Sequence, residues 1–157
     1  MVVSSGTDQA TARVRELMER IADAAGVDAD VEINVDTDGL TAEYVGEDLA
    51  LLIGHHGQTI DAIQHLAYRF ATHGESERLP VVVDASGYRE RRAQTLRQTA
   101  EQAAQMAVGD RRPVPLEAMS ALERKVIHEY LKDRRDVETY SEGQEPSRRL
   151  VVAPLVD

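Results

Sequence analysis

The tetrapeptide Gly54-His55-His56-Gly57 is the part of this sequence best equipped for chemistry. Two imidazoles between two glycines could bind a metal ion, act as an acid–base pair, or meet the backbone of a nucleic acid. Adjacent histidines rarely converge on one ion, and no third ligand stands near them. The chain has no cysteine and no positioned Ser–His–Asp pattern, so we expect neither a metal site nor catalysis here.

The glycines of this loop suit a tight turn between two helices. Glycine tolerates a positive φ and lets a backbone approach closely, because it has no Cβ. A helix that begins at Gln58 would point free N–H groups and its positive dipole end at the same turn. These features favour an anion site, with a sugar–phosphate backbone as the anion. The alternative is a plain helix–turn–helix corner with exposed imidazoles.

A second pair with chemical potential is Arg124 and His128, four residues apart. Ser120-x-x-Glu123 is typical of a capping box, so we expect a helix from Ser120 to about Lys132. Helical periodicity places one group of apolar residues on the buried side: Leu122, Val126, Ile127, Tyr130 and Leu131. It turns a group of cations toward solvent: Arg124, Lys125, His128 and Lys132, with Arg134 and Arg135 after them.

Later arginines could join this cationic group. The segment "EGQEPSRR" between the last two expected strands supplies Arg148 and Arg149. A guanidinium can grip a phosphate with two hydrogen bonds or stack on a base, and an imidazole can donate to a phosphate. The alternative is a solvated, charged helix face. We interpret the arginines of "YRERRAQTLRQ" as solvated or as ion-pair partners of the acidic first half, with direct contact to a nucleic acid as the alternative: Arg89, Arg91, Arg92 and Arg97.

The elements that must position these residues follow from apolar spacing and turn signals. The first half predicts a helix over 8–25, a β-hairpin over 31–36 and 40–46, a short helix ending at Gly54, a helix over 58–72 and a strand over 79–85. In the helix over 58–72, we expect one buried face: Ile60, Ile63, Ala67 and Phe70.

The second half predicts a long helix over 88–108, a helix over 120–132, and strands over 136–141 and 149–153. The segment "GDRRPVPLE", with two prolines, is interpreted as a break between the helices. We expect an α+β chain of two domains, 1–86 and 87–157. Composition changes at this boundary, since residues 1–86 hold five basic and 16 acidic residues, whereas 87–157 hold 13 basic and 12 acidic residues.

The net charge of −10 lowers the affinity expected for a nucleic acid without excluding it, because a local groove can still be basic. No apolar run approaches the ~18 residues of a membrane helix, and the N-terminus lacks the features of a secretory signal. With no cysteine, a cytoplasmic protein that does not insert into membranes is expected.

The order helix–strand–strand–helix–helix–strand, with a Gly-x-x-Gly loop between the last two helices, resembles the type II KH domain, and "LIGHHGQTIDAIQHLAYRFA" carries that resemblance. The resemblance implies that the loop clamps roughly four nucleotides of single-stranded RNA or DNA. It implies Gly54, His55, His56 and Gly57 as the backbone grip, and a groove for bases lined by Ile53, Ile60 and Ile63. KH loops usually carry Lys or Arg at the histidine positions, so we expect weak, pH-sensitive binding.

The segment "MSALERKVIHEYLKDRR" resembles the small α+β domain named for its Arg-x-x-x-His motif, the R-three-H domain, which binds single-stranded nucleic acid. A KH domain followed directly by this domain resembles the bacterial Jag/EloR/KhpB family. The resemblance implies these RNA contacts in the second domain: Arg124, Lys125, His128, Lys132, Arg148 and Arg149.

The family resemblance implies a non-enzymatic RNA chaperone or post-transcriptional regulator that affects cell elongation and division. No cofactor is expected, and the partners implied are single-stranded RNA, with single-stranded DNA as a variant, and a small KH-domain protein or a second copy of the chain. Two rival classes stay open: an interaction adaptor whose KH domain mediates dimerisation or docking, and a metal-dependent phosphodiesterase using the histidines.

Overall fold

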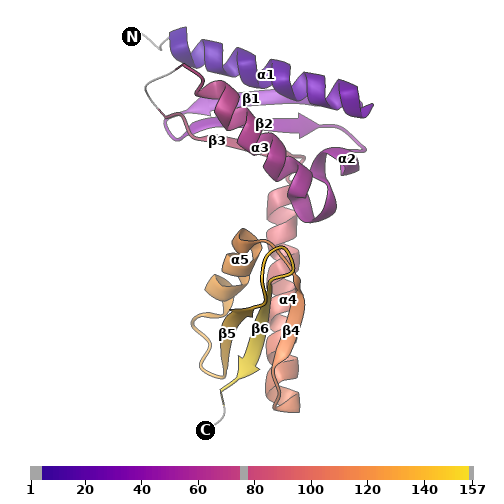
Figure 1. Ribbon diagram of the computed structural model, residues 1–157, viewed down its shortest axis with the longest axis vertical. Helices are drawn as coiled ribbons and strands as arrows, with labels where there is room; N and C mark the ends of the chain where they lie inside the picture. Colours follow the sequence, from indigo (N-terminus) through magenta and orange to yellow (C-terminus); the bar gives the residue numbers. More distant parts are fainter. Residues whose placement is uncertain (1–4, 75–77, 156–157) are drawn as a thin grey trace. The chain divides into compact units, whose positions relative to one another are not determined.

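The computed structural model describes residues 5–74 and 78–155, which form two units, Met1–Arg89 and Glu90–Asp157 (Figure 1). The first unit has the element order helix–strand–strand–helix–helix–strand that the sequence predicts. Its elements are α1 (Ser5–Ala25), β1 (Asp30–Asp36), β2 (Gly39–Val45), α2 (Ala50–Ile53), α3 (Gln58–Ala71) and β3 (Val81–Ala85), with one 3₁₀ turn (His55–Gly57) between α2 and α3.

The sheet of the first unit has the strand order β1-β2-β3. The predicted hairpin is confirmed: β1 and β2 are antiparallel, and Asp36 Oδ1 closes their turn by accepting from the backbone N–H groups of Asp38 (2.8 Å) and Gly39 (3.2 Å). Strand β3 lies parallel to β2, with Leu40 opposite Val81. The return to a parallel strand requires a crossover, which α2 and α3 provide.

Helices α1 and α3 pack against one another and against the sheet, and their buried residues form one core with it (Figure 1). Tyr44 is fully buried there, and its hydroxyl donates to the carbonyl of Met18 at 2.8 Å; burial raises the pKa of the Tyr44 hydroxyl. The prediction that Phe70 is buried is wrong, since 47% of it is exposed. The buried stripe of α3 continues to Ala71 instead, and Phe70 lies at its edge beside the exposed Leu66.

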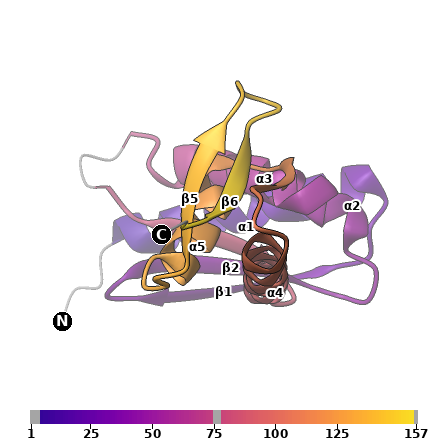
Figure 2. The same cartoon turned by 90° about the horizontal axis from the view of Figure 1, so that it is seen from below.

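The second unit contains most of α4 (Tyr88–Asp110), then β4 (Val114–Ala118), α5 (Ala121–Leu131), β5 (Val137–Glu142) and β6 (Arg149–Pro154). Its antiparallel sheet has the order β4-β6-β5, and Figure 2, which looks along α4, shows β5 and β6 side by side. Strand β4 was not predicted, because its Pro115 resembled a helix break. Proline is tolerated there because β4 is an edge strand, with an irregular register between Pro115 and Ala118.

The core of the second unit lies between the two helices and one face of the sheet. Helix α4 contributes small residues after Leu96, and the others come from α5 and the sheet: Ala100, Ala103, Ala104, Ala107, Ile127, Leu131, Val137, Leu150 and Val152. An alanine stripe lets a helix approach its neighbours closely. The expected α+β class is confirmed in both units, and none of the described helices is long and apolar enough to cross a membrane.

Candidate functional site

The Gly54–Gly57 loop is a tight turn built from unusual backbone conformations. Gly54 has φ 73° and ψ −177°, a combination essentially restricted to glycine. His56 (φ 51°, ψ 29°) and Gly57 (φ 81°, ψ 11°) are both left-handed. The N–H of Gly57 donates to the carbonyl of Gly54 at 3.3 Å, which closes the turn. The chain therefore reverses between α2 and α3 within four residues, as the sequence predicts.

Packing as well as backbone geometry requires both glycines. A Cβ on Gly54 would overlap Thr59 Oγ1, and a Cβ on Gly57 would lie 2.7 Å from Tyr88 Cε1. Between them, the rings of His55 and His56 stack with their centroids 3.9 Å apart and their planes at 25°. His55 is exposed and His56 is half-buried. The loop therefore carries a stacked pair of imidazole rings on a tightly packed backbone turn.

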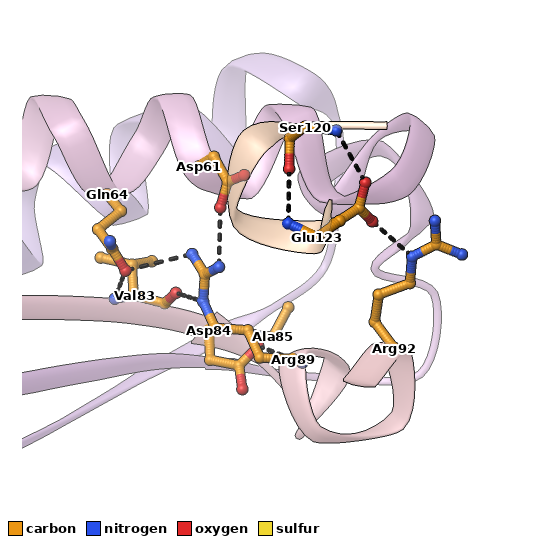
Figure 3. A network of polar contacts seen from close by, with 9 residues as sticks. All are labelled: Asp61, Gln64, Val83, Asp84, Ala85, Arg89, Arg92, Ser120 and Glu123. Atoms are coloured by element: carbon orange, nitrogen blue, oxygen red, sulfur yellow. Dashed lines mark hydrogen bonds and ion pairs between the residues drawn. The ribbon is translucent and has the colours of Figure 1, made fainter. Parts of the chain in front are cut away.

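The start of α3 lies next to this pair. No side chain caps the helix at Gly57; the N–H of Gln58 donates to the carbonyl of His55, and the N–H groups that follow it in the first turn have no acceptor within the helix. Asp61 in the first turn is held by Arg89, whose Nη1 lies 2.7 Å from Asp61 Oδ1 (Figure 3). Arg89 also donates to the Val83 carbonyl at 2.9 Å and to Gln64 at 3.2 Å. The expectation that Arg89 pairs with an acid of the first half is confirmed.

The prediction that Ile53, Ile60 and Ile63 line an apolar groove beside the loop is wrong. Ile60 is fully buried and Ile63 is almost so, both within the core under α3, and Ile53 is half-buried. The cause is the direction of the helix face, since these positions point toward the sheet rather than toward the loop surface. Bases of a bound strand would therefore have no contact with Ile60 or Ile63.

In the second unit, the capping box at the start of α5 is confirmed. Ser120 Oγ accepts from the N–H of Glu123 at 3.3 Å, and Glu123 Oε2 accepts from the N–H of Ser120 at 3.2 Å (Figure 3). The second carboxylate oxygen of Glu123 accepts from Arg92 Nε at 2.7 Å. Arg92 is therefore an ion-pair partner within the second unit, and it fixes the direction in which α5 begins.

The orientation predicted for Arg124 is wrong. Only 8% of Arg124 is exposed: its Nη1 donates to the carbonyls of Met119 (2.6 Å) and Arg148 (3.4 Å), and its Nη2 donates to Glu145 Oε1 (2.6 Å). On the opposite side, Leu122 is 69% exposed and Tyr130 is also exposed, although both were expected to be buried. Helix α5 therefore buries a different face from the one that periodicity predicted, because Arg124 can be buried when its hydrogen-bond donors have acceptors.

The other cations of α5 are exposed as expected: Lys125, His128 and Lys132. His128 Nδ1 lies 2.6 Å from the Thr139 hydroxyl on β5, which fixes the imidazole ring. Lys132 Nζ donates to Glu129 at 2.8 Å. The pKa of Glu129 is lowered, first by that hydrogen bond and then by the surrounding positive charge of Lys132, His128 and Lys125. These cations therefore gather around one carboxylate on the surface of the helix.

The two arginines after the β5–β6 loop have different surroundings. Arg149 pairs with Glu142 on the neighbouring strand, with Nη2 at 2.7 Å from Oε1. Arg148 is half-buried, and its Nε is buried without a hydrogen bond in the described part of the chain. The acids that pair with cations of this site were missed in the sequence: Glu142, which meets Arg149, and Glu145, which meets Arg124. Their only sequence signal is that they share the short segment that carries the arginines.

Arg134, expected as a solvent-facing cation, forms part of the structure of the second unit instead. It donates to Glu101 on α4 at 2.9 Å and to Asp136 at 2.7 Å. Those hydrogen bonds hold the pKa values of the Glu101 and Asp136 carboxyls below their usual range. Among the described residues, no group of three His, Cys, Asp or Glu side chains is placed to hold a metal ion.

Comparison with known proteins agrees with this geometry. Residues 11–83 match the model of the KhpA/KhpB KH domain, and residues 94–154 match the model of the R-three-H domain. Each unit therefore has the domain type that the resemblances implied. Neither the KH nor the R-three-H domain is an enzymatic family.

Similar curated proteins are all named RNA-binding protein KhpB. The protein of Lactiplantibacillus plantarum is 40% identical over 82% of this chain and 40% of its own length. That of Clostridium symbiosum is 35% identical over 88% and 63%, and that of Bacillus subtilis is 33% identical over 87% and 66%. This chain thus spans less than two thirds of the length of each of these relatives. It contains a match to the KhpA/KhpB KH domain followed by a match to the R-three-H domain, and over most of its length it is similar to proteins named KhpB.

Proposed function

We propose that this protein binds single-stranded RNA through both units, using the Gly54–Gly57 loop in the first and α5 with the β5–β6 loop in the second. The observation that carries the proposal is the pairing of a KhpA/KhpB KH domain with an R-three-H domain in one chain. The similar proteins bear the name RNA-binding protein. Single-stranded DNA presents the same phosphates and is a second substrate to test.

In the first unit, the loop geometry supports a contact with the sugar–phosphate backbone. The glycines keep side chains away from the turn, and the uncapped N-terminus of α3 offers N–H donors and a positive dipole end to an anion. The imidazoles of His55 and His56 lie at the same place. An imidazole N–H can donate a hydrogen bond to a phosphate oxygen.

In the second unit, exposed cations supply the phosphate contacts. His128 is held by Thr139 through Nδ1, so its Nε2 is the atom that meets a ligand. Arg124 also positions the edge of the site, because its Nη1 donates to the carbonyls of Met119 and Arg148. The proposed contact residues of both units are Gly54, His55, His56, Gly57, Arg124, Lys125, His128, Lys132, Arg148 and Arg149.

Two weak binding sites that contact the same RNA molecule give a higher overall affinity through effective concentration. This arrangement suits an acidic chain with few exposed cations. With ~4 phosphates neutralised, the logarithm of the binding constant falls with the logarithm of salt concentration at a slope of about −3. From the family, we further propose a cytoplasmic RNA chaperone or post-transcriptional regulator linked to cell elongation.

The test is fluorescence anisotropy with a labelled oligouridylate of about 12 nucleotides, which exceeds the roughly four that a KH loop clamps. Wild type is compared with His55→Asp/His56→Asp and with Lys125→Ala/His128→Ala. Each double variant is expected to weaken binding by about ten-fold, the loss of one or two charge-assisted hydrogen bonds.

The control for the loop variant is His65→Asp/His73→Asp, which makes the same charge change at two exposed histidines of the same unit. The control is expected to lose much less affinity than the loop variant. Equal losses in both would mean that only the overall charge matters. A wild-type protein that fails to bind at low salt would refute the proposed function and favour the adaptor.

We also propose that the first unit pairs with another KH domain, from a second copy or a small partner, through the exposed side of α3. Leu66 and Phe70 are both exposed there, although they are large and apolar. Phe70 borders an apolar groove of about 710 Å³ between α1 and α3, together with Leu17 and Ile21. Exposed apolar surface of this kind marks protein contacts.

The pairing proposal predicts that Leu66→Glu/Phe70→Glu lowers the mass measured by sedimentation from dimer to monomer. Charges at these positions would be buried unpaired in the interface, at a cost of several kcal/mol. Val82→Glu is the control, because Val82 is also exposed and apolar but lies on β3. A wild-type protein that is monomeric at all concentrations and in the presence of a small KH protein would contradict this proposal.

A further inference from the structure

Carboxylates of the second unit already occupy several of its proposed RNA-binding cations. Glu145 lies 2.6 Å from Arg124, Glu142 lies 2.7 Å from Arg149, and Glu129 lies 2.8 Å from Lys132. In the last two pairs both side chains are about half exposed, as is usual for surface ion pairs, which contribute little. The pair of Arg124 and Glu145 is different.

Arg124 and Glu145 are unequal partners. The Arg124 side chain is 10% exposed and fixed by two backbone carbonyls, whereas the Glu145 side chain is 58% exposed and comes from the loop between β5 and β6. The guanidinium stays in place whatever Glu145 does. An anion that met Nη2 of Arg124 from the position of the Glu145 carboxylate would have to displace it, while Nη1 keeps the carbonyls of Met119 and Arg148.

Arg148 gives a second, independent observation at the same place. Its carbonyl lies 3.4 Å from Arg124 Nη1, and its own Nε is buried without a hydrogen bond in the described part of the chain. Buried donors without a partner are rare in proteins and costly. The Glu145 carboxylate satisfies Arg124 Nη2, and the loop that carries it still holds one buried donor without an acceptor in the described part of the chain, Arg148 Nε. A phosphate that replaced the Glu145 carboxylate would offer more acceptor oxygens to Arg124 Nη2.

We propose that Glu145 occupies the position of an RNA phosphate, and that RNA binds the R-three-H unit by displacing this carboxylate from Arg124. The inference rests on the proposed function. Glu145 is thus an internal competitor that limits the affinity of the second unit. Removing its charge frees Arg124 Nη2 for a phosphate, so the affinity for single-stranded RNA increases.

The experiment compares Glu145→Gln with Glu138→Gln in the full chain, using the labelled oligouridylate. Glu138 is the matched control: it is exposed on β5, has no ion pair within the described residues, and its substitution changes the net charge equally. Glu145→Gln is expected to bind about five-fold more tightly than Glu138→Gln, the scale of one ion pair near the surface. Its salt dependence is expected to steepen by about 0.7, the contribution of one added phosphate.

Each outcome decides the question. If wild type binds RNA and the two variants bind alike, Glu145 is only a structural partner of Arg124 and the inference is wrong, while the proposed function stands. If neither wild type nor Glu145→Gln binds, both fail. Binding by Glu145→Gln alone would support strong competition.

A structural artefact is checked by a second variant. Glu145→Asp keeps the charge but shortens the side chain, so it is expected to bind between wild type and Glu145→Gln with an unchanged thermal midpoint. The inference would be overturned if the RNA affinities of the two variants changed in step with their loss of thermal stability and not with the release of Arg124 from the carboxylate.

Discussion

Replacing Arg124 by lysine is expected to destabilise the second unit by about 1–3 kcal/mol, although the positive charge is kept. A lysine has a single Nζ atom on an unbranched chain, so it cannot place donors at both positions that the two terminal nitrogens of Arg124 occupy, one facing Met119 and Arg148 and the other facing Glu145. At least one buried carbonyl would lose its partner. RNA affinity is expected to fall with it, because the Arg148 backbone would no longer be held at the site.

The midpoint of urea unfolding measures this effect, and Arg149→Lys is its control. Arg149 is also an arginine paired with one glutamate, but both side chains are more than two fifths exposed, so its replacement is expected to change stability by less than about 0.5 kcal/mol. Equal effects of the two substitutions would show that the buried bonds of Arg124 contribute no more than a surface pair does.

Gly54→Ala is expected to destabilise the first unit by more than about 2 kcal/mol and to reduce RNA binding by the loop. Two penalties add at this position: the backbone conformation at φ 73° and ψ −177° is unfavourable for alanine, and the new Cβ would overlap the Thr59 hydroxyl. Since Thr59 is in the first turn of α3, relief of the overlap would shift the start of that helix.

Gly26→Ala separates these two penalties. Gly26 also has a positive φ, 68°, but a Cβ there would meet nothing within 4 Å. Its replacement is therefore expected to cost only the backbone term, about 1 kcal/mol, with RNA affinity unchanged. Thermal unfolding of the two variants gives the comparison, and a similar loss of stability in both would mean that the contact with Thr59 is unimportant.

The parts of the fold that sequence predicted are those in which the local pattern and the tertiary environment agree. The hairpin of β1 and β2 alternates apolar and polar residues around a turn that Asp36 stabilises through its own side chain. The capping box at Ser120 is likewise local, because both of its hydrogen bonds join residues three apart. Strand β4 was missed because the proline that argues against it is acceptable only at a sheet edge, and strand order is not visible in the sequence.

The site was harder to predict than the fold. Its loop follows from two glycines, but the orientation of α5 depends on carbonyls and acids that are distant in the chain. Periodicity treats Arg124 as a polar residue to be exposed, whereas Met119, Arg148 and Glu145 together supply the acceptors that allow its burial. Leu122 and Tyr130 are exposed as a result. Nothing in the spacing of α5 itself reveals these partners.

Helix α4 has a consequence for how the protein can be dissected. Its first two residues, Tyr88 and Arg89, belong by their contacts to the first unit. Tyr88 fills the space against Gly57, and Arg89 neutralises Asp61 beside the loop. A KH fragment that ends where the composition changes, at 86, would leave out both residues. A KH fragment that keeps these contacts of the Gly54–Gly57 loop must therefore extend at least to Arg89, within α4. Recombination that joined the two domains at residue 86 would separate the loop from Tyr88 and Arg89.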